Sequence, residues 1–208
     1  MTAVTVDHDS HAAHDAHGHP PTTTGVSNEK VAMWAFLGSE CLLFGALIST
    51  FFLYRDRHPM GTLRPHDVYD IPFTSGSSFI LLMSSLTMVL ALSAFNRGDH
   101  RRSSVWLTTT AVLGAIFLGG QIYEFSVFVR EGMTLKTNPA WSAFYVLTGF
   151  HGTHVAIGVL MLLALVGMIA KGKIPQAKAE VIEIIGLYWH FVDVVWVVVF
   201  TVVYLLPL

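Results

Sequence analysis

Five long apolar stretches dominate this chain of 208 residues. They cover residues 31–54, 76–95, 105–129, 141–170 and 182–208, and their lengths are 24, 20, 25, 30 and 27 residues. A helix needs roughly 20 residues to cross the about 30 Å of hydrocarbon in a bilayer, so each stretch is long enough to span one. Strands are a poor alternative, because membrane strands alternate apolar and polar residues over about ten positions and these stretches do not. The sequence therefore predicts an all-α fold, a polytopic membrane bundle of five transmembrane helices.

The composition agrees with lipid as the surrounding solvent. Charged residues make up only 12% of the chain, about half of the roughly 25% that is usual in soluble domains. The formal net charge is −2 and there is no long basic run, so nucleic acid is not an expected partner. The single cysteine, Cys41, excludes an internal disulfide framework and a thiolate metal cluster.

The first 30 residues differ from the rest because they are polar and rich in histidine. The histidines of this segment are His8, His11, His14, His17 and His19. No apolar stretch there is long enough to bury, and the basic start of a secretory signal is missing. We therefore predict a disordered His-rich cytoplasmic tail at residues 1–30, followed by a five-helix transmembrane domain at residues 31–208.

Positive charges in the loops predict which end of the bundle faces the cytoplasm. Lys and Arg number seven in the tail and the second and fourth loops, and five in the first and third loops. Because basic loops stay on the cytoplasmic side, we expect a cytoplasmic N-terminus. Two of these residues, Arg101 and Arg102, lie beside a span end, where they can also contact anionic lipid headgroups.

Six ionisable side chains lie well inside the predicted spans, where each costs at least about 2.5 kcal/mol, and Glu183 lies at the inner edge of the last span. The six are Glu40, Glu124, His151, His154, His190 and Asp193. His151 and His154 are three residues apart and therefore share a helix face, and so do His190 and Asp193. These faces are expected to point into the bundle or toward a partner protein.

Positions along the helices place these groups at two depths, at 1.5 Å per residue. We expect an inner polar layer of Glu40, His190 and Asp193. An outer layer would hold Glu124 and His151, with His154 between the layers. Three roles stay open for such carboxylate and imidazole groups: a buried hydrogen-bonded latch, a proton relay, or a metal site of the di-iron or zinc type.

Four short motifs resemble subunit III of the haem-copper oxidases. The longest is Tyr-Trp-His-Phe-Val-Asp-Val-Val-Trp at residues 188–196, and residues 148–155 read Thr-Gly-Phe-His-Gly-Thr-His-Val. The other two are Gln-Ile-Tyr-Glu-Phe at residues 121–125 and Gly-Ser-Glu at residues 38–40, in the order that the family has them. Glu40 matches the buried glutamate of the family.

The resemblance implies a non-catalytic, integral subunit III of a proton-pumping aa3-type cytochrome c oxidase in the aerobic respiratory chain of a bacterial cell membrane. Such a subunit supports the stability and proton uptake of subunit I. It has no catalytic centre and binds no haem or copper, so haem a and copper are expected in partner subunits. Subunits I and II and membrane phospholipids are the expected partners, and a respiratory supercomplex is kept open as a larger assembly. The six buried polar residues then become structural or proton-related.

The chain resembles the five-span form of the family, which lacks the first two of seven helices. Those two helices form one wall of a lipid-holding cleft, so that wall has no counterpart here. Two alternatives remain at this stage: subunit III of a quinol oxidase, and a free-standing membrane protein for metal or proton transport.

Overall fold

The computed structural model describes residues 27–55, 70–175 and 179–206. Its helices are α1 (Asn28–Tyr54), α2 (Ile71–Asn96), α3 (His100–Arg130), α4 (Pro139–Ala170), α5 (Ala179–Phe200) and the short π-helix η3 (Thr201–Leu205), which continues α5. Five helices are long and apolar enough to cross a membrane, α5 being counted together with η3. The described residues contain no strand. The predicted all-α bundle of five transmembrane helices is confirmed.

Polar caps make the helices longer than the apolar stretches. The Asp70 side chain accepts a hydrogen bond from the backbone N–H of Phe73 at 3.1 Å, so α2 begins five residues before the apolar run. Asp99 and Asn138 cap α3 and α4 in the same way. Each cap satisfies a backbone N–H that the first helical turn leaves free.

The first helix also begins earlier than expected. Ser27 caps it, and α1 starts at Asn28, three residues before the predicted boundary at residue 31. Residues 1–26 of the predicted His-rich tail lie outside the described residues.

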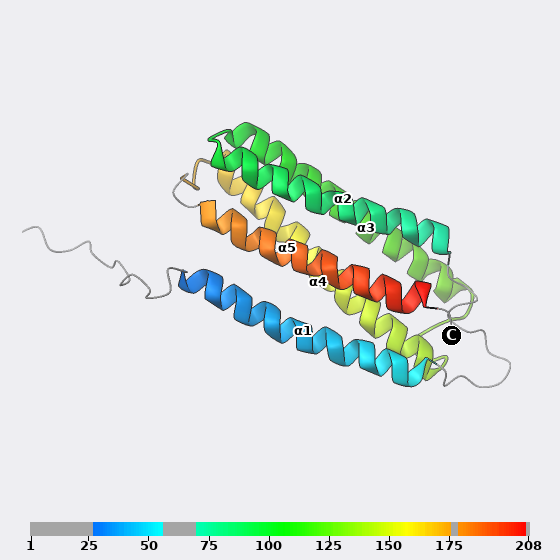
Figure 1. Ribbon diagram of the computed structural model, residues 1–208. Coiled ribbons are helices and arrows are strands. Elements are labelled where there is room, and N and C mark those ends of the chain that lie inside the picture. Colours follow the sequence, from blue (N-terminus) through cyan, green and yellow to red (C-terminus); the bar gives the residue numbers. More distant parts are fainter. Residues whose placement is uncertain (1–26, 56–69, 176–178, 207–208) are drawn as a thin grey trace, which may run out of the picture.

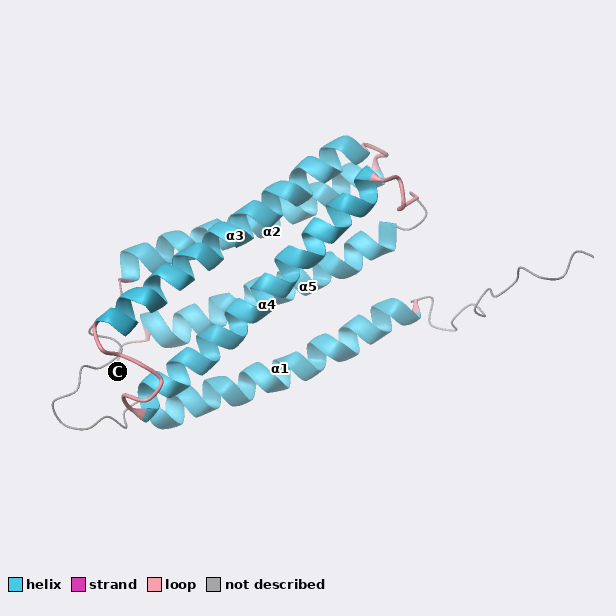
Figure 2. Ribbon diagram, turned by 180° about the vertical axis from the view of Figure 1, so that it is seen from behind, coloured by secondary structure: helices cyan, strands magenta, loops and turns pink. Residues whose placement is uncertain are grey.

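The five helices form three layers (Figures 1 and 2). The hairpin of α2 and α3 makes one layer, α4 and α5 make the middle layer, and α1 lies outside against α4 and α5. Gly98, with φ +80°, gives the tight bend between α2 and α3. The starts of α1, α3 and α5 lie at one end of the bundle, which we call the first end.

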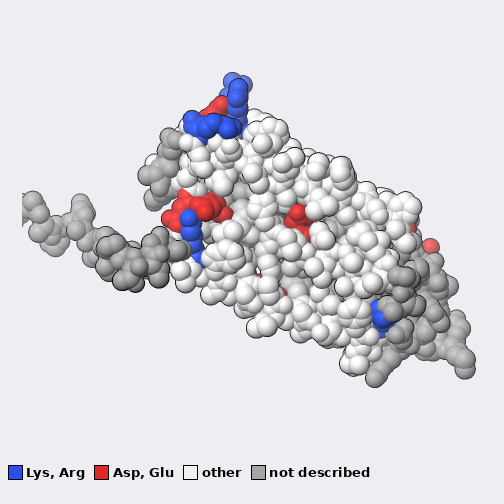
Figure 3. Space-filling model, viewed as in Figure 1, with Lys and Arg blue, Asp and Glu red and all other residues white. Residues whose placement is uncertain are grey.

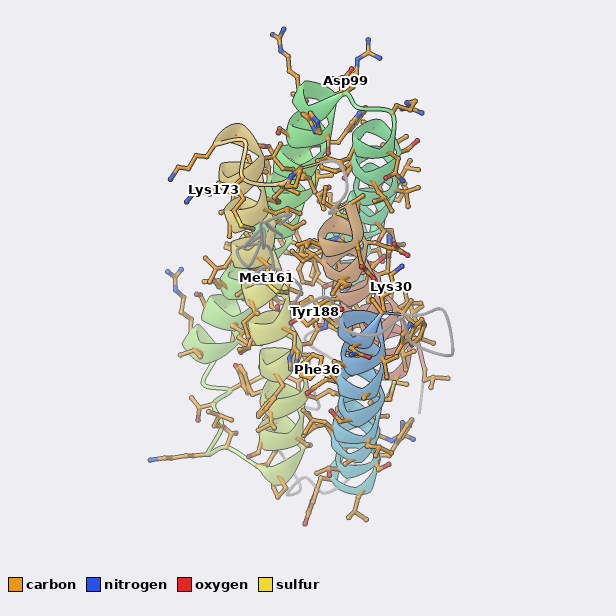
Figure 4. All side chains as sticks on the ribbon, turned by 90° about the vertical axis from the view of Figure 1, so that its left-hand side faces the viewer. Lys30, Phe36, Asp99, Met161, Lys173 and Tyr188 are labelled. Carbon is orange, nitrogen blue, oxygen red and sulfur yellow. The ribbon has the colours of Figure 1, made fainter. Side chains whose placement is uncertain are left out.

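α1 is attached by a narrow seam. Its buried residues are only Leu37, Phe44 and Phe51, which are seven positions apart and thus lie on one line along the helix. Figure 4 shows Phe36 and Tyr188 in the space between α1 and α4, and their rings stack with centroids 6.4 Å apart. Most of the α1 surface is therefore left for lipid or for another protein.

The buried Trp189 of α5 locks the middle of the bundle. Its ring lies against Gly114 of α3 and Gly158 of α4, and its indole N–H donates to the hydroxyl of Ser84 on α2 at 3.0 Å. A Cβ at Gly114 would lie 2.5 Å from the Trp189 ring, and one at Gly158 would lie 2.8 Å from it. Both glycines are required because the ring occupies the space of their side chains.

Gly114→Ala is expected to lower the free energy of unfolding by about 1–3 kcal/mol, because the added methyl group overpacks the Trp189 ring. Thermal unfolding of the full chain in mild detergent measures the effect. Gly119→Ala on the same helix is the matched control, since nothing lies within 4 Å of its Cβ position. Equal stability of the two variants would contradict this packing.

Candidate functional site

The polar side chains inside the spans form three clusters at different helix contacts. The Glu40–His154 pair joins α1 to α4. The Ser85 cluster, made of Ser85, His190 and Asp193, joins α2 to α5. The Glu124 cluster, made of Thr74, Glu124 and Tyr204, joins α3 to α2 and η3.

The Glu40–His154 pair is nearly closed, with side chains 14% and 12% exposed. Nδ1 of His154 lies 2.8 Å from the carbonyl oxygen of Phe150, and Nε2 lies 3.1 Å from Oε2 of Glu40. A carbonyl oxygen only accepts, so Nδ1 is a donor. The ring of Phe44 meets the His154 ring edge to face at 5.1 Å and covers the pair on one side.

This geometry gives the pair one proton to share. Nδ1 of His154 already carries its hydrogen, so a neutral ring has only a lone pair on Nε2. The hydrogen of the second bond then comes from a protonated Glu40, or the ring is protonated and Glu40 is ionised. Both states have zero net charge, which suits a site inside the membrane. The pair can thus act as a latch and can also hold or pass on a single proton.

The Ser85 cluster is open on one side. The Ser85 hydroxyl donates to Oδ2 of Asp193 at 2.6 Å, and Nδ1 of His190 lies 3.3 Å from the Ser85 oxygen. Asp193 is 6% exposed, while Ser85 and His190 are half-buried. Its chemistry is therefore that of an interhelical hydrogen-bond network with one accessible imidazole.

The Glu124 cluster is buried, with Glu124 7% exposed. The Thr74 hydroxyl donates to Oε1 at 2.9 Å and the Tyr204 hydroxyl donates to Oε2 at 3.1 Å. Tyr204 belongs to the π-helix η3 at the end of α5. One carboxylate thus connects three segments of the chain at the end opposite the first end.

His151 lies apart from these clusters. Its ring is 0% exposed and stacks on Trp196 at 4.8 Å, with Phe117 at 5.9 Å and Phe44 at 6.5 Å. Neither ring nitrogen has a hydrogen-bond partner within the described residues. His151 and His154 share a helix face, but their environments are aromatic and polar respectively.

His151→Phe is expected to change the free energy of unfolding by less than about 1.5 kcal/mol, because the ring already behaves as an aromatic core residue of similar volume. Thermal unfolding of the full chain checks this. A large loss of stability would show that a ring nitrogen has a partner.

The predicted inner layer does not form one hydrogen-bonded cluster. Glu40 bonds to His154, whereas His190 and Asp193 meet at Ser85. His151 packs against Phe117, which precedes Glu124 on α3 by seven residues, or about 10 Å. Counting residues along a single helix predicts how deep a side chain lies in the membrane, but it does not predict which side chains of other helices it contacts.

The clusters do not converge into one centre. Within the described residues no three His, Cys, Asp or Glu side chains are grouped as they would be to hold a metal ion. The hydroxyl partners Ser85, Thr74 and Tyr204 were not identified from the sequence. Ser85 and Tyr204 are hydroxyl residues inside the apolar stretches, whereas Thr74 precedes the second stretch and belongs to α2 because that helix begins at Ile71.

At the first end the positive charges have separate partners. Lys30 of α1 lies 2.9 Å from Glu183 and 3.7 Å from Glu180, both on α5, and Figure 4 shows Lys30 at the start of α1. Arg102 pairs with Asp99 at 3.2 Å. Arg101 and Arg102 are exposed beside a surface hollow that Val105 and Trp106 also line.

Comparison with known proteins gives a consistent family. The sequence profile described as cytochrome c oxidase subunit III matches residues 8–207. Quinol oxidase subunit 3 of Bacillus subtilis (strain 168) is 38% identical over 204 residues, which cover 98% of each chain. Cytochrome c oxidase subunit 3 of Bacillus sp. (strain PS3) is 40% identical over 179 residues, 86% of each chain.

The five apolar helices, the buried polar clusters and these matches agree with one another. The family profile matches nearly the whole chain, and the relatives are oxidase subunits. These matches argue against the alternative of a free-standing membrane protein for metal or proton transport. The chain therefore belongs to the cytochrome c oxidase subunit III family, as a multi-pass bacterial membrane protein and a subunit of an oxidase complex.

Proposed function

We propose that this chain is a non-catalytic subunit of a proton-pumping aa3-type oxidase, with haem a, copper and oxygen reduction in partner subunits I and II. One observation carries the proposal: each carboxylate buried in the spans is used to join helices. Glu40 bonds α4, Asp193 bonds α2, and Glu124 bonds α2 and η3. Carboxylates engaged in this way stabilise a scaffold.

Within that complex, the Glu40–His154 pair supports the stability and proton uptake of subunit I. The pair is close to the surface of the chain, is neutral overall and holds one proton. Its Glu40 lies on α1, the least deeply buried helix, which only a narrow seam attaches to the rest of the bundle. Loss of the pair would therefore loosen the helix and remove a proton carrier at the same time.

Cytochrome c is the proposed electron donor. A quinol is the second candidate, and a specific observation favours it: the quinol oxidase relative matches 98% of the chain, whereas the cytochrome c oxidase relative matches 86%. Donor-binding groups are expected on other subunits in both cases.

The first end is proposed to face the cytoplasm, because the basic residues concentrate there. Lys30, Arg101 and Arg102 belong to this end. With Trp106 beside them, the two arginines are suited to an anionic phospholipid headgroup.

A visible spectrum tests the main proposal. The tagged full chain is purified from its native membrane in mild detergent and is expected to bring haem a and copper with it in partner subunits. Oxidation of reduced cytochrome c, compared with oxidation of a quinol by the same preparation, then identifies the donor. A colourless preparation, or oxidase activity in the chain freed of every other subunit, would contradict the proposal.

A further inference from the structure

The outward strip of α5 carries a polar atom in the middle of the membrane. We define this strip by His190, Val194 and Val197, which lie on one face of the helix between its neighbours α2 and α1. Val194 is 61% exposed and Val197 is 43% exposed, while His190 is half-buried. Nε2 of His190 makes no hydrogen bond within the described residues, and it is not among their buried unpartnered atoms. It therefore opens onto the surface.

The hydrogen bonds of the Ser85 cluster determine what this atom needs. The Ser85 hydroxyl has one hydrogen and donates it to Asp193, so Nδ1 of His190 is the donor in its contact with Ser85. A neutral imidazole that donates from Nδ1 has a lone pair on Nε2. The exposed nitrogen is therefore a hydrogen-bond acceptor, and it requires a donor from outside the chain.

Lipid cannot supply this donor. His190 follows Ala179, the first residue of α5, by eleven residues, or about 16 Å, and precedes Leu205 by about 22 Å. Headgroups at either surface are thus out of reach, and acyl tails have no donor. An unsatisfied polar atom in hydrocarbon costs several kcal/mol. The Glu40–His154 pair, in contrast, satisfies both of its imidazole nitrogens within the chain.

The surface around His190 is suited to contact with another transmembrane helix. In Figure 3, which views the face made by α1, α5 and α2, the blue side chains lie at the ends of the molecule, and the middle is white apart from red acidic atoms between α5 and α2. On α2, Leu82 and Val89 lie one turn to either side of Ser85 and are 42% and 52% exposed. Oδ1 of Asp193, in the same cluster, also has no hydrogen-bond partner among the described residues. An apolar surface with these few acceptors matches an apolar helix that carries a donor side chain.

We infer that this strip, with the neighbouring edge of α2, is the docking face for a transmembrane helix of another subunit of the same oxidase, and that this helix presents a hydrogen-bond donor side chain to Nε2 of His190. The inference rests on the proposed function, because membership of an oxidase complex supplies the partner. It goes further by assigning the face, the depth and the chemistry of the contact.

Photo-crosslinking from four lipid-level positions tests the face. A benzophenone amino acid replaces Val194 on α5 in the full chain of the assembled complex, and the controls carry it at Leu42 on α1, Ile122 on α3 or Leu160 on α4, which are 78%, 66% and 66% exposed. We expect Val194 to crosslink to another oxidase subunit in high yield. Crosslinking of Val194 to lipid alone, or to a second copy of this chain, would overturn the inference.

Two substitutions of His190 test the donor. His190→Phe removes the acceptor and is expected to lower the amount of co-purifying subunits by about three- to fifteen-fold in detergent. His190→Gln offers a side-chain oxygen as a replacement acceptor and is expected to restore most of the yield. Equal yields for both variants and the parent would refute the contact. A parent chain that brings no haem-bearing subunit refutes the proposed function instead, so the two failures are distinguishable.

Discussion

Glu40→Leu is expected to lower the free energy of unfolding by about 1–3 kcal/mol and to reduce the number of turnovers that the oxidase completes before it inactivates. The substitution leaves Nε2 of His154 without a partner in a nearly closed site and removes the hydrogen bond that joins Glu40 of α1 to His154 of α4. Glu40→Gln has a different effect, because its amide N–H can donate to the neutral ring but cannot transfer a proton. We expect this variant to keep the stability of the parent and to lose its durability.

The two readouts separate a latch from a proton carrier. Unfolding of the chain in detergent measures the latch, and the count of turnovers before inactivation in the assembled oxidase measures the proton role. Ser39→Ala is a matched control on the same helix, since the Ser39 hydroxyl is exposed and its only hydrogen bond among the described residues goes to the carbonyl of Phe36. A Glu40→Gln oxidase with the initial rate and durability of the parent would show that the pair is only a latch.

The five spans could be predicted from sequence because hydrocarbon thickness imposes a simple length rule on apolar segments. Helix ends followed a different rule, the capping of free N–H groups, which hydropathy does not detect. Asp70 and Asp99 are charged residues outside the apolar runs, yet each starts a helix. The turn at Gly98 needs a left-handed backbone, a requirement that composition alone does not express.

The polar residues of the candidate site could be predicted from the sequence, but the side chains that they contact could not. Periodicity correctly put His190 and Asp193 on one face, and both meet Ser85. It also put His151 and His154 on one face, yet one is enclosed by aromatic rings and the other bonds Glu40. The difference comes from packing: α1 reaches α4 at His154, while Phe44, Phe117 and Trp196 surround His151. The residue pattern of a single helix does not show such contacts with other helices.

Glu124→Leu is expected to cost about 2–4 kcal/mol of unfolding free energy, because it removes the carboxylate that accepts hydrogen bonds from the buried hydroxyl groups of Thr74 and Tyr204. The Thr74 hydroxyl lies within hydrogen-bond distance of a second acceptor, the carbonyl oxygen of Asp70 at 3.0 Å, which limits its share of the loss. Thermal unfolding of the full chain in mild detergent measures the effect.

A second substitution tests the contact between Glu124 and Tyr204. Tyr204→Phe removes the hydroxyl that donates to Oε2 of Glu124, so it is expected to cost about 1–2 kcal/mol less in the Glu124→Leu background than in the parent. Ser126→Ala controls for hydroxyl loss on α3, since Ser126 is exposed and, in the part of the chain that the structure describes, its hydroxyl donates only to the carbonyl of Ile122. If the two losses simply add, the Tyr204 hydroxyl does not depend on Glu124. A smaller cost of Tyr204→Phe in the Glu124→Leu background would instead show that the carboxylate holds η3 against α3, which is how one buried acid can stabilise the end of a transmembrane bundle.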